Sequence, residues 1–111
     1  MSVVTKPLIT AKYASNSETT EYTAGTGTRT LIDKFTGYNS SGAGVVLSVK
    51  LVPSGGSAGA SNLIIPKTIP AGETYTFPEV VGHVLEPGGF ISVLSGSASA
   101  VVIRASGREV T

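Results

Sequence analysis

The sequence predicts an all-β protein, an antiparallel β-sandwich of jelly-roll-like or immunoglobulin-like topology with an extended N-terminal arm. Two observations predict it. Short runs such as residues 45–52 alternate apolar and polar side chains with a period of two, which marks a strand with one face against a core. Each run ends at a proline- and glycine-rich turn, as at 53–56, 69–72 and 86–89. Six to eight such strands with almost no helical spacing are typical of a sandwich, although periodicity does not choose its topology.

Length and composition indicate one domain with little surface charge. The chain has 111 residues, of which 14% are charged, against roughly 25% in a typical globular domain. This composition favours a surface that copies of the chain or a partner cover. The eight Lys and Arg residues are scattered and the net charge is +1, so nucleic-acid binding is not expected. The absence of cysteine excludes disulfides, cysteine-ligated zinc and thiol catalysis.

No targeting or membrane segment is visible in the sequence. The N-terminus lacks the apolar stretch of a signal peptide, and no run approaches the roughly 20 apolar residues of a membrane span. We therefore expect a chain made in the cytoplasm, without an export signal and without a membrane partner.

The N-terminal segment differs in texture from the rest. Residues 3–5 and 8–11 have strand character, Pro7 interrupts them, and residues 14–30 are polar and rich in Ser and Thr. The segment is either an arm that orders on a neighbouring subunit or an edge strand with a loop. We divide the chain into an arm or edge segment, 1–30, and a sandwich domain, 31–111. Removal of residues 1–28 is expected to leave a folded domain.

The strands of the remaining chain follow from their turns. Residues 31–39 and 45–52 are predicted to form a hairpin, because only a few residues separate them. The glycine-rich stretch 54–61 is predicted to be an exposed tip, followed by a short strand at 62–66. Residues 78–85 favour either a helical turn that begins at Pro78 or a strand bent at Gly82.

The C-terminal part is predicted to close the fold as a second hairpin. Residues 90–95 and 100–105 are its strands, and 96–99 is its turn. Alternation in the last strand predicts which side chains point inward. The inward set is Val101, Ile103 and Ala105, and the outward set is Val102, Arg104 and Ser106.

No catalytic or metal-binding pattern stands out. His83 is the single histidine, it lies in an apolar stretch, and no G-x-S-x-G motif accompanies it, so we interpret it as a partly buried structural residue. Glu79 and Glu86 are interpreted as solvated charges and not as a glycosidase pair. The glycine-rich stretches lack the Lys-Ser/Thr of a phosphate loop. We predict a protein without enzymatic activity, metal or cofactor, in which His83→Ala affects stability at most.

What remains is an interaction surface. Outward apolar residues on predicted strands indicate subunit contacts, or alternatively a sandwich that is apolar on both faces. Tyr38, Tyr75 and Phe77 are the first candidates for a carbohydrate-binding cluster. The candidate interface residues are Val3, Val4, Leu8, Ile9, Tyr13, Tyr22, Val46, Val52 and Val102.

Residues 31–111 resemble a small β-sandwich module of tailed-bacteriophage structural proteins. The stretches that carry the resemblance are LVPSGGSAGASNLII, IPAGETYTFPEVVGHVLEPGGFISV and the closing strand with SGREVT. The resemblance implies a capsid cement or decoration protein, a homodimer or homotrimer on the capsid surface that binds the major capsid protein. The alternatives are a tail, neck or fibre component, or a jelly-roll carbohydrate- or receptor-binding module.

Overall fold

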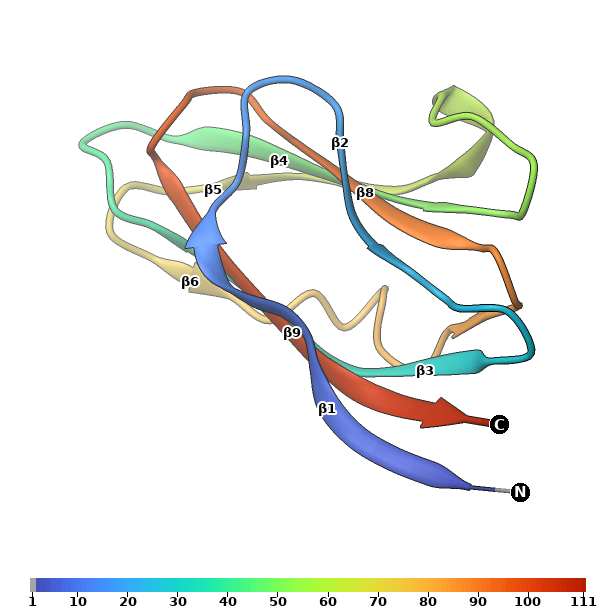
Figure 1. Cartoon of the computed structure of the whole chain (residues 1–111). Helices are drawn as coiled ribbons and strands as arrows, with labels where there is room; N and C mark the ends of the chain where they lie inside the picture. The colour runs from blue at the N-terminus through green and yellow to red at the C-terminus, as the bar shows by residue number, and fades with distance from the viewer. Residues whose placement is uncertain (1) are drawn as a thin grey trace.

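The chain folds into two antiparallel sheets that pack face to face (Figure 1), in a computed structural model that describes residues 2–111. The first, sheet A, is the lower layer in Figure 1. Its strands in spatial order are β1 (Val3–Tyr13), β9 (Val101–Val110) and β3 (Arg29–Asn39), and two short strands, β6 (Thr74–Tyr75) and β7 (Val84–Leu85), pair with the other edge of β3.

The second, sheet B, holds four strands. Their spatial order is β2 (Thr19–Thr23), β8 (Phe90–Ser95), β4 (Val45–Val52) and β5 (Leu63–Ile69). A single 3-10 turn, η1 (Ala60–Asn62), precedes β5, and it is the one helical element within residues 2–111. No helix of this part of the chain is long and apolar enough to cross a membrane.

The pairing pattern is that of a jelly roll. Strand β1 pairs with β9, β2 with β8, β3 with β6 and β7, and β4 with β5, all antiparallel. If β6 and β7 are taken as one interrupted strand, the chain is a long hairpin of four strand pairs that is rolled so that successive pairs alternate between the sheets. The predicted sandwich and its jelly-roll-like topology are therefore confirmed.

Both predicted hairpins are wrong, because the consecutive strands lie in different sheets. Strands β3 and β8 are followed by β4 and β9 in the opposite layer. The buried Asn39 shows why the first connection is a corner: its side-chain amide donates to the carbonyls of Ala43 and Ile69, both at 2.8 Å, and its oxygen accepts from the Ser41 amide at 2.9 Å. These bonds satisfy the backbone where the chain leaves one sheet for the other.

The N-terminal segment supplies one edge strand to each sheet. Strand β1 pairs along β9, and Leu8 and Ile9 are both buried in the core. Register shifts around Ile9 allow these neighbours to pack inward together. The segment is therefore an edge strand of the domain, as in the second alternative, and not a free arm. Strand β3 begins at Arg29, which is before the division that we placed after residue 30.

The core lies between the sheets around three aromatic rings. The Phe77 ring stacks edge to face with Phe35 at 5.1 Å and with Tyr75 at 4.9 Å. Phe77 adopts a left-handed backbone (φ 44°), a strained conformation for an aromatic residue, and its full burial offsets that strain. The other large, fully buried side chains are Ile32, Leu47, Val49, Val52, Ile69, Val80, Ile91, Val93, Val101 and Ile103.

Residues 78–82 form turns and not a helix, and His83 joins them to β7. Their backbone bonds to the edge of β3 instead: Gly82 donates to the Ile32 carbonyl at 2.7 Å and Ile32 donates to the His83 carbonyl at 3.0 Å. Gly82 has a φ of 90°, which glycine adopts without strain. The chain therefore reverses at Gly82 and enters β7, close to the bent-strand alternative. His83 is exposed and not partly buried as predicted.

Two local predictions are confirmed. The side chains of Val101, Ile103 and Ala105 are buried and that of Arg104 is exposed, as alternation in the last strand indicates. The connection between β4 and β5 is largely exposed, as expected for a tip.

Candidate interface surfaces

The predicted catalytic candidates have separate partners. Glu79 accepts a hydrogen bond from the Tyr75 hydroxyl at 2.7 Å, and Glu86 accepts one from Arg29 Nε at 2.8 Å. Within residues 2–111 no three His, Asp or Glu side chains gather as a metal site would require. The hydrogen bond to Glu79 raises the pKa of Tyr75. These contacts tie neighbouring segments together.

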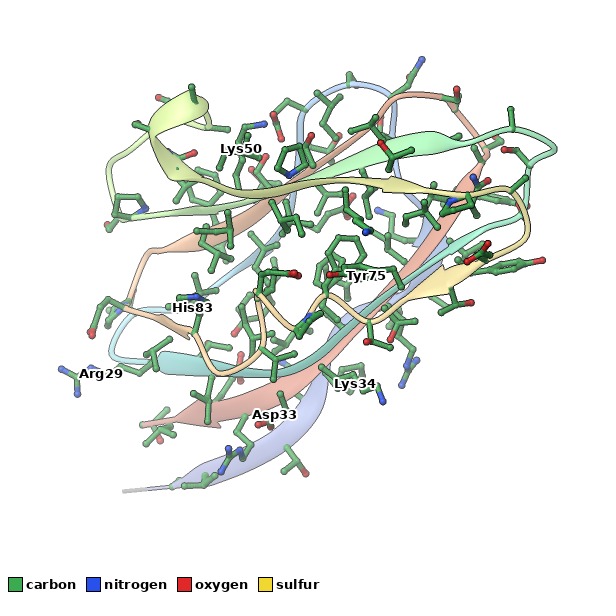
Figure 2. The ribbon with its side chains drawn as sticks, turned by 180° about the vertical axis from the view of Figure 1, so that it is seen from behind. Arg29, Asp33, Lys34, Lys50, Tyr75 and His83 are labelled. Atoms are coloured by element: carbon green, nitrogen blue, oxygen red, sulfur yellow. The ribbon has the colours of Figure 1, made fainter. Side chains whose placement is uncertain are left out.

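The outer face of sheet A is shaped by a β-bulge in β3. The register with β9 shifts between Ile32 and Lys34, so Ile32 and Phe35 both point into the core while Asp33 and Lys34 both point out. Asp33 is held by Arg108 through two parallel bonds of 2.9 and 3.0 Å. Figure 2 shows Asp33 and Lys34 on the outside of the sheet and Tyr75 between the layers. The bulge therefore adds one more polar side chain to the outside than regular alternation gives.

A row of apolar and aromatic side chains crosses the same face. Val102 of β9 lies opposite Tyr13 of β1 on one side and Tyr38 of β3 on the other. Tyr13 is 51% exposed and Tyr38 is 42% exposed, and Val102 is half-buried between them. Cross-strand neighbours have Cβ atoms about 5 Å apart, so the three side chains form a continuous surface.

Two cations stand beside this row. Arg104 of β9 faces Thr36 of β3, and Lys34 lies next along the same face. A shallow hollow of about 210 Å³ is lined by Lys34, Thr36, Arg104 and Ser106. Within residues 2–111, neither cation forms an ion pair. The outer face of sheet A is therefore both aromatic and positively charged.

The outer face of sheet B is aliphatic, and the charged side chains that residues 2–111 place on it are ion-paired. Val46 is 42% exposed on β4, Ile64 is 37% exposed on β5, and Leu94 of β8 is half-buried. Ser48 lies between Leu94 and Pro66 across the sheet. A hollow of about 270 Å³ next to Val46 and Leu94 is lined by Asn16, Val46, Ser48, Leu94, Ser95 and Gly96.

The cation on the outer side of sheet B is neutralised. Lys50 is buried, and its ammonium donates to Glu18 Oε1 at 2.5 Å, while Glu18 Oε2 accepts from the Ser92 hydroxyl at 2.6 Å. Burial acts to raise the pKa of Glu18, but the hydrogen bonds from Lys50 and Ser92 outweigh it and lower that pKa below 4.5. The segment before β2 thus covers Lys50 and supplies its counter-charge.

Tyr22 ties the two sheets together. Its hydroxyl, on β2, donates to Glu109 Oε2 at 2.5 Å and lies 2.7 Å from the Thr30 hydroxyl, so it reaches β9 and β3 of the other sheet. Burial, together with the hydrogen bond to Glu109, raises the pKa of Tyr22 to about 12. The Tyr22 hydroxyl therefore makes hydrogen bonds within the subunit.

The structure separates the predicted interface residues into two groups. Leu8, Ile9 and Val52 are buried within the subunit, so no partner can reach them and the prediction is wrong for these three. Val52 keeps its register with β8, but the loop after β4 packs against it at Gly56. The residues whose side chains remain wholly or partly accessible are Val3, Val4, Tyr13, Tyr22, Val46 and Val102.

The predicted carbohydrate cluster is not assembled. Phe77 is fully buried, and Tyr75 contacts it between the sheets, whereas Tyr38 points outward. The sequence predicted Arg104 to point outward, but neither Arg104 nor Lys34 was among the predicted interface residues. A signal for Lys34 was present: Ile32 and Phe35 are apolar residues three apart in a strand, a spacing that breaks the period of two and indicates a bulge.

The comparisons with known proteins identify a fold and no family. No protein-family model and no curated protein matches the chain. One similar solved structure comes from Bacillus endospore appendages, described as a family of disulfide-linked pili, with a TM-score of 0.58 and 13% identity over 98% of this chain and 88% of that chain. Another comes from infectious bursal disease virus, strain Gx, with a TM-score of 0.54 and 14% identity over 97% of this chain and 32% of that chain. At such identities the likeness shows the fold alone.

Proposed function

We propose that the chain is a non-enzymatic structural protein of a tailed-bacteriophage virion, a cement protein on the outside of the head that stabilises contacts between major capsid proteins. The observation that carries the proposal is the exposure of apolar and aromatic side chains on both outer faces of a sandwich whose core is already filled. Two exposed faces of this kind indicate interaction surfaces.

The charge distribution supports a homo-oligomer joined through sheet B. Its outer face presents Val46, Ile64 and Leu94 and no free cation, so two copies can meet there without repulsion between like charges. The chain has no cysteine, so the disulfide linkage named for the appendage protein has no counterpart in it.

The sheet edges favour discrete copies over a continuous fibre. Pro7 lies in the edge strand β1 and Pro66 in the edge strand β5, and proline cannot donate to an added strand. The prolines of these two edges favour contacts between copies through the faces of the sandwich. A dimer or trimer that engages several capsid proteins at once binds far more tightly than one subunit does, because the later contacts become intramolecular.

Co-sedimentation with phage heads tests the proposal. Purified protein is mixed with mature heads of the encoding phage that lack it, and bound copies are counted. We expect saturable binding at a copy number that matches the symmetry of the capsid, together with greater resistance of the heads to heat. Absence of binding to heads, with binding to tails or fibres instead, would overturn the cement role in favour of the alternative virion position.

A further inference from the structure

We propose that the outer face of sheet A binds an acidic segment of the partner protein, with carboxylates at Lys34 and Arg104 and apolar side chains on the row Tyr13, Val102 and Tyr38. The identity of the partner as a capsid protein rests on the proposed function. The acidic character of the ligand rests on the face itself.

Most basic side chains of the protein already have a partner group. Five of the eight basic side chains form ion pairs within the chain. Of the other three, Lys67 lies 4.6 Å above the Tyr75 ring, which leaves Lys34 and Arg104 without a partner group among residues 2–111. Both stand on one face, on adjacent strands, and line the same hollow. The one acid beside them, Asp33, is engaged by Arg108.

The β-bulge in β3 places Lys34 on the outer face of sheet A. Without the bulge at Asp33, regular alternation would turn one of Asp33 and Lys34 toward the core. Lys34 also borders a second hollow, of about 280 Å³, that is lined by Asp33, Thr76, Pro78 and Val81. The cation therefore stands between two depressions, one on the β9 side of β3 and one on the side of residues 76–81, and an extended segment that crosses β3 could occupy both.

A second copy is disfavoured as the occupant. A two-fold dimer through this face would bring the two unpaired cations of each copy, four positive charges in all, into one interface. A neutral glycan matches the face less well, because it would leave the charges of Lys34 and Arg104 uncompensated. A polypeptide with acidic and apolar side chains matches both the two cations and the apolar row of this face.

The test compares charge reversals on and off the face. The test variant is Lys34→Glu/Arg104→Glu. The control is Lys67→Glu, which reverses a cation at the β5 edge. Circular dichroism checks that both variants remain folded. The probe is poly-L-glutamate, followed by chemical shifts in two-dimensional NMR. We expect shifts that cluster on the amides of Tyr13, Tyr38, Lys34 and Arg104, about tenfold weaker binding or more in the test variant, and unchanged binding in the control.

Shifts spread over the whole surface, or equal losses in the test variant and the control, would overturn the proposal. So would binding of polygalacturonate in preference to poly-L-glutamate, which would identify an acidic glycan as the ligand. Head binding is measured in parallel. A test variant that binds heads as well as the native protein would refute the acidic-segment site on sheet A and leave the cement role intact. Binding of poly-L-glutamate by a native protein that does not bind heads would support that site and refute the cement role.

Discussion

The two outer faces of the sandwich share one scaffold and differ in charge. On sheet A, a bulge turns Lys34 outward beside Arg104, and both cations remain uncompensated next to exposed tyrosines. On sheet B, Lys50 also lies on the outer side, but the segment before β2 covers it and supplies Glu18. The placement of a few ionic side chains therefore makes one face suited to an acidic partner and the other suited to a copy of itself.

The largest expected effect comes from removing the strand that borders sheet A. Deletion of residues 1–13 removes the pairing of β1 with β9 and the buried side chains Leu8 and Ile9. We expect the cooperative thermal transition to disappear, contrary to what the sequence alone predicts for the loss of residues 1–28. Val3→Ser/Val4→Ser, at the exposed end of the same strand, is the control and should retain the transition. A cooperative transition in the deletion variant would show that residues 14–111 fold without this strand.

Next in size is the ion pair beneath the sheet B face. Glu18→Ala leaves the buried Lys50 ammonium without its acceptor, and we expect a loss of about 1–3 kcal/mol in the free energy of unfolding at pH 7. Asp33→Ala on sheet A leaves Arg108 exposed to water, so its effect should be clearly smaller. Urea denaturation of both variants checks the order. Equal losses would mean that the two faces do not differ in the burial of their charges.

The same pair gives a pH dependence of known sign. Because the pKa of Glu18 is lowered in the folded protein, its stabilising contribution is present above pH 4.5 and is lost as the pH falls through the folded pKa. The difference in stability between the native protein and Glu18→Gln should therefore shrink from pH 7 to about pH 3. A difference that is constant over this range would contradict the role of Lys50 and Ser92 as donors.

A smaller loss of stability is expected when the hydrogen bonds of Tyr22 between the two sheets are removed. Tyr22→Phe removes the hydroxyl that reaches Glu109 and Thr30 and should cost about 1 kcal/mol. Because the pKa of Tyr22 is raised to about 12, its contribution is complete below pH 10 and is lost as the pH rises toward 12. Ultraviolet titration should show a tyrosine that ionises near pH 12, and that transition should be missing in Tyr22→Phe.

The smallest effect on stability, and the sharpest on assembly, is expected from Val46→Glu. This exposed site on sheet B should tolerate the change within about 0.5 kcal/mol. In a contact between copies, the added carboxylate would meet an aliphatic face, so sedimentation velocity should show a shift toward monomer. Lys34→Glu is the matched control on sheet A and should leave self-association unchanged. Dissociation of both variants would show that the copies do not associate through sheet B alone.

The local structure was predictable from the sequence, and the pairing of the strands was not. Alternation in residues 101–105 identified the inward side chains because the period of a strand is a local property. The connection after Asn39 looks the same for a hairpin and for a corner, and the difference lies in its hydrogen bonds to Ala43 and to the distant Ile69. The row Tyr13, Val102, Tyr38 could not be predicted because β9 joins β1 and β3 only in the folded chain.

The most direct test of the account is hydroxyl-radical footprinting of the protein free and bound to phage heads, read by mass spectrometry. Tyr13 and Tyr38 react readily with hydroxyl radicals and are exposed in the free subunit. The account predicts that both lose reactivity on the head, while Tyr75, which packs between the sheets, reacts equally in the two states. Tyr13 and Tyr38 that stay as reactive on the head as in solution would show that the outer face of sheet A is not the surface that binds the partner.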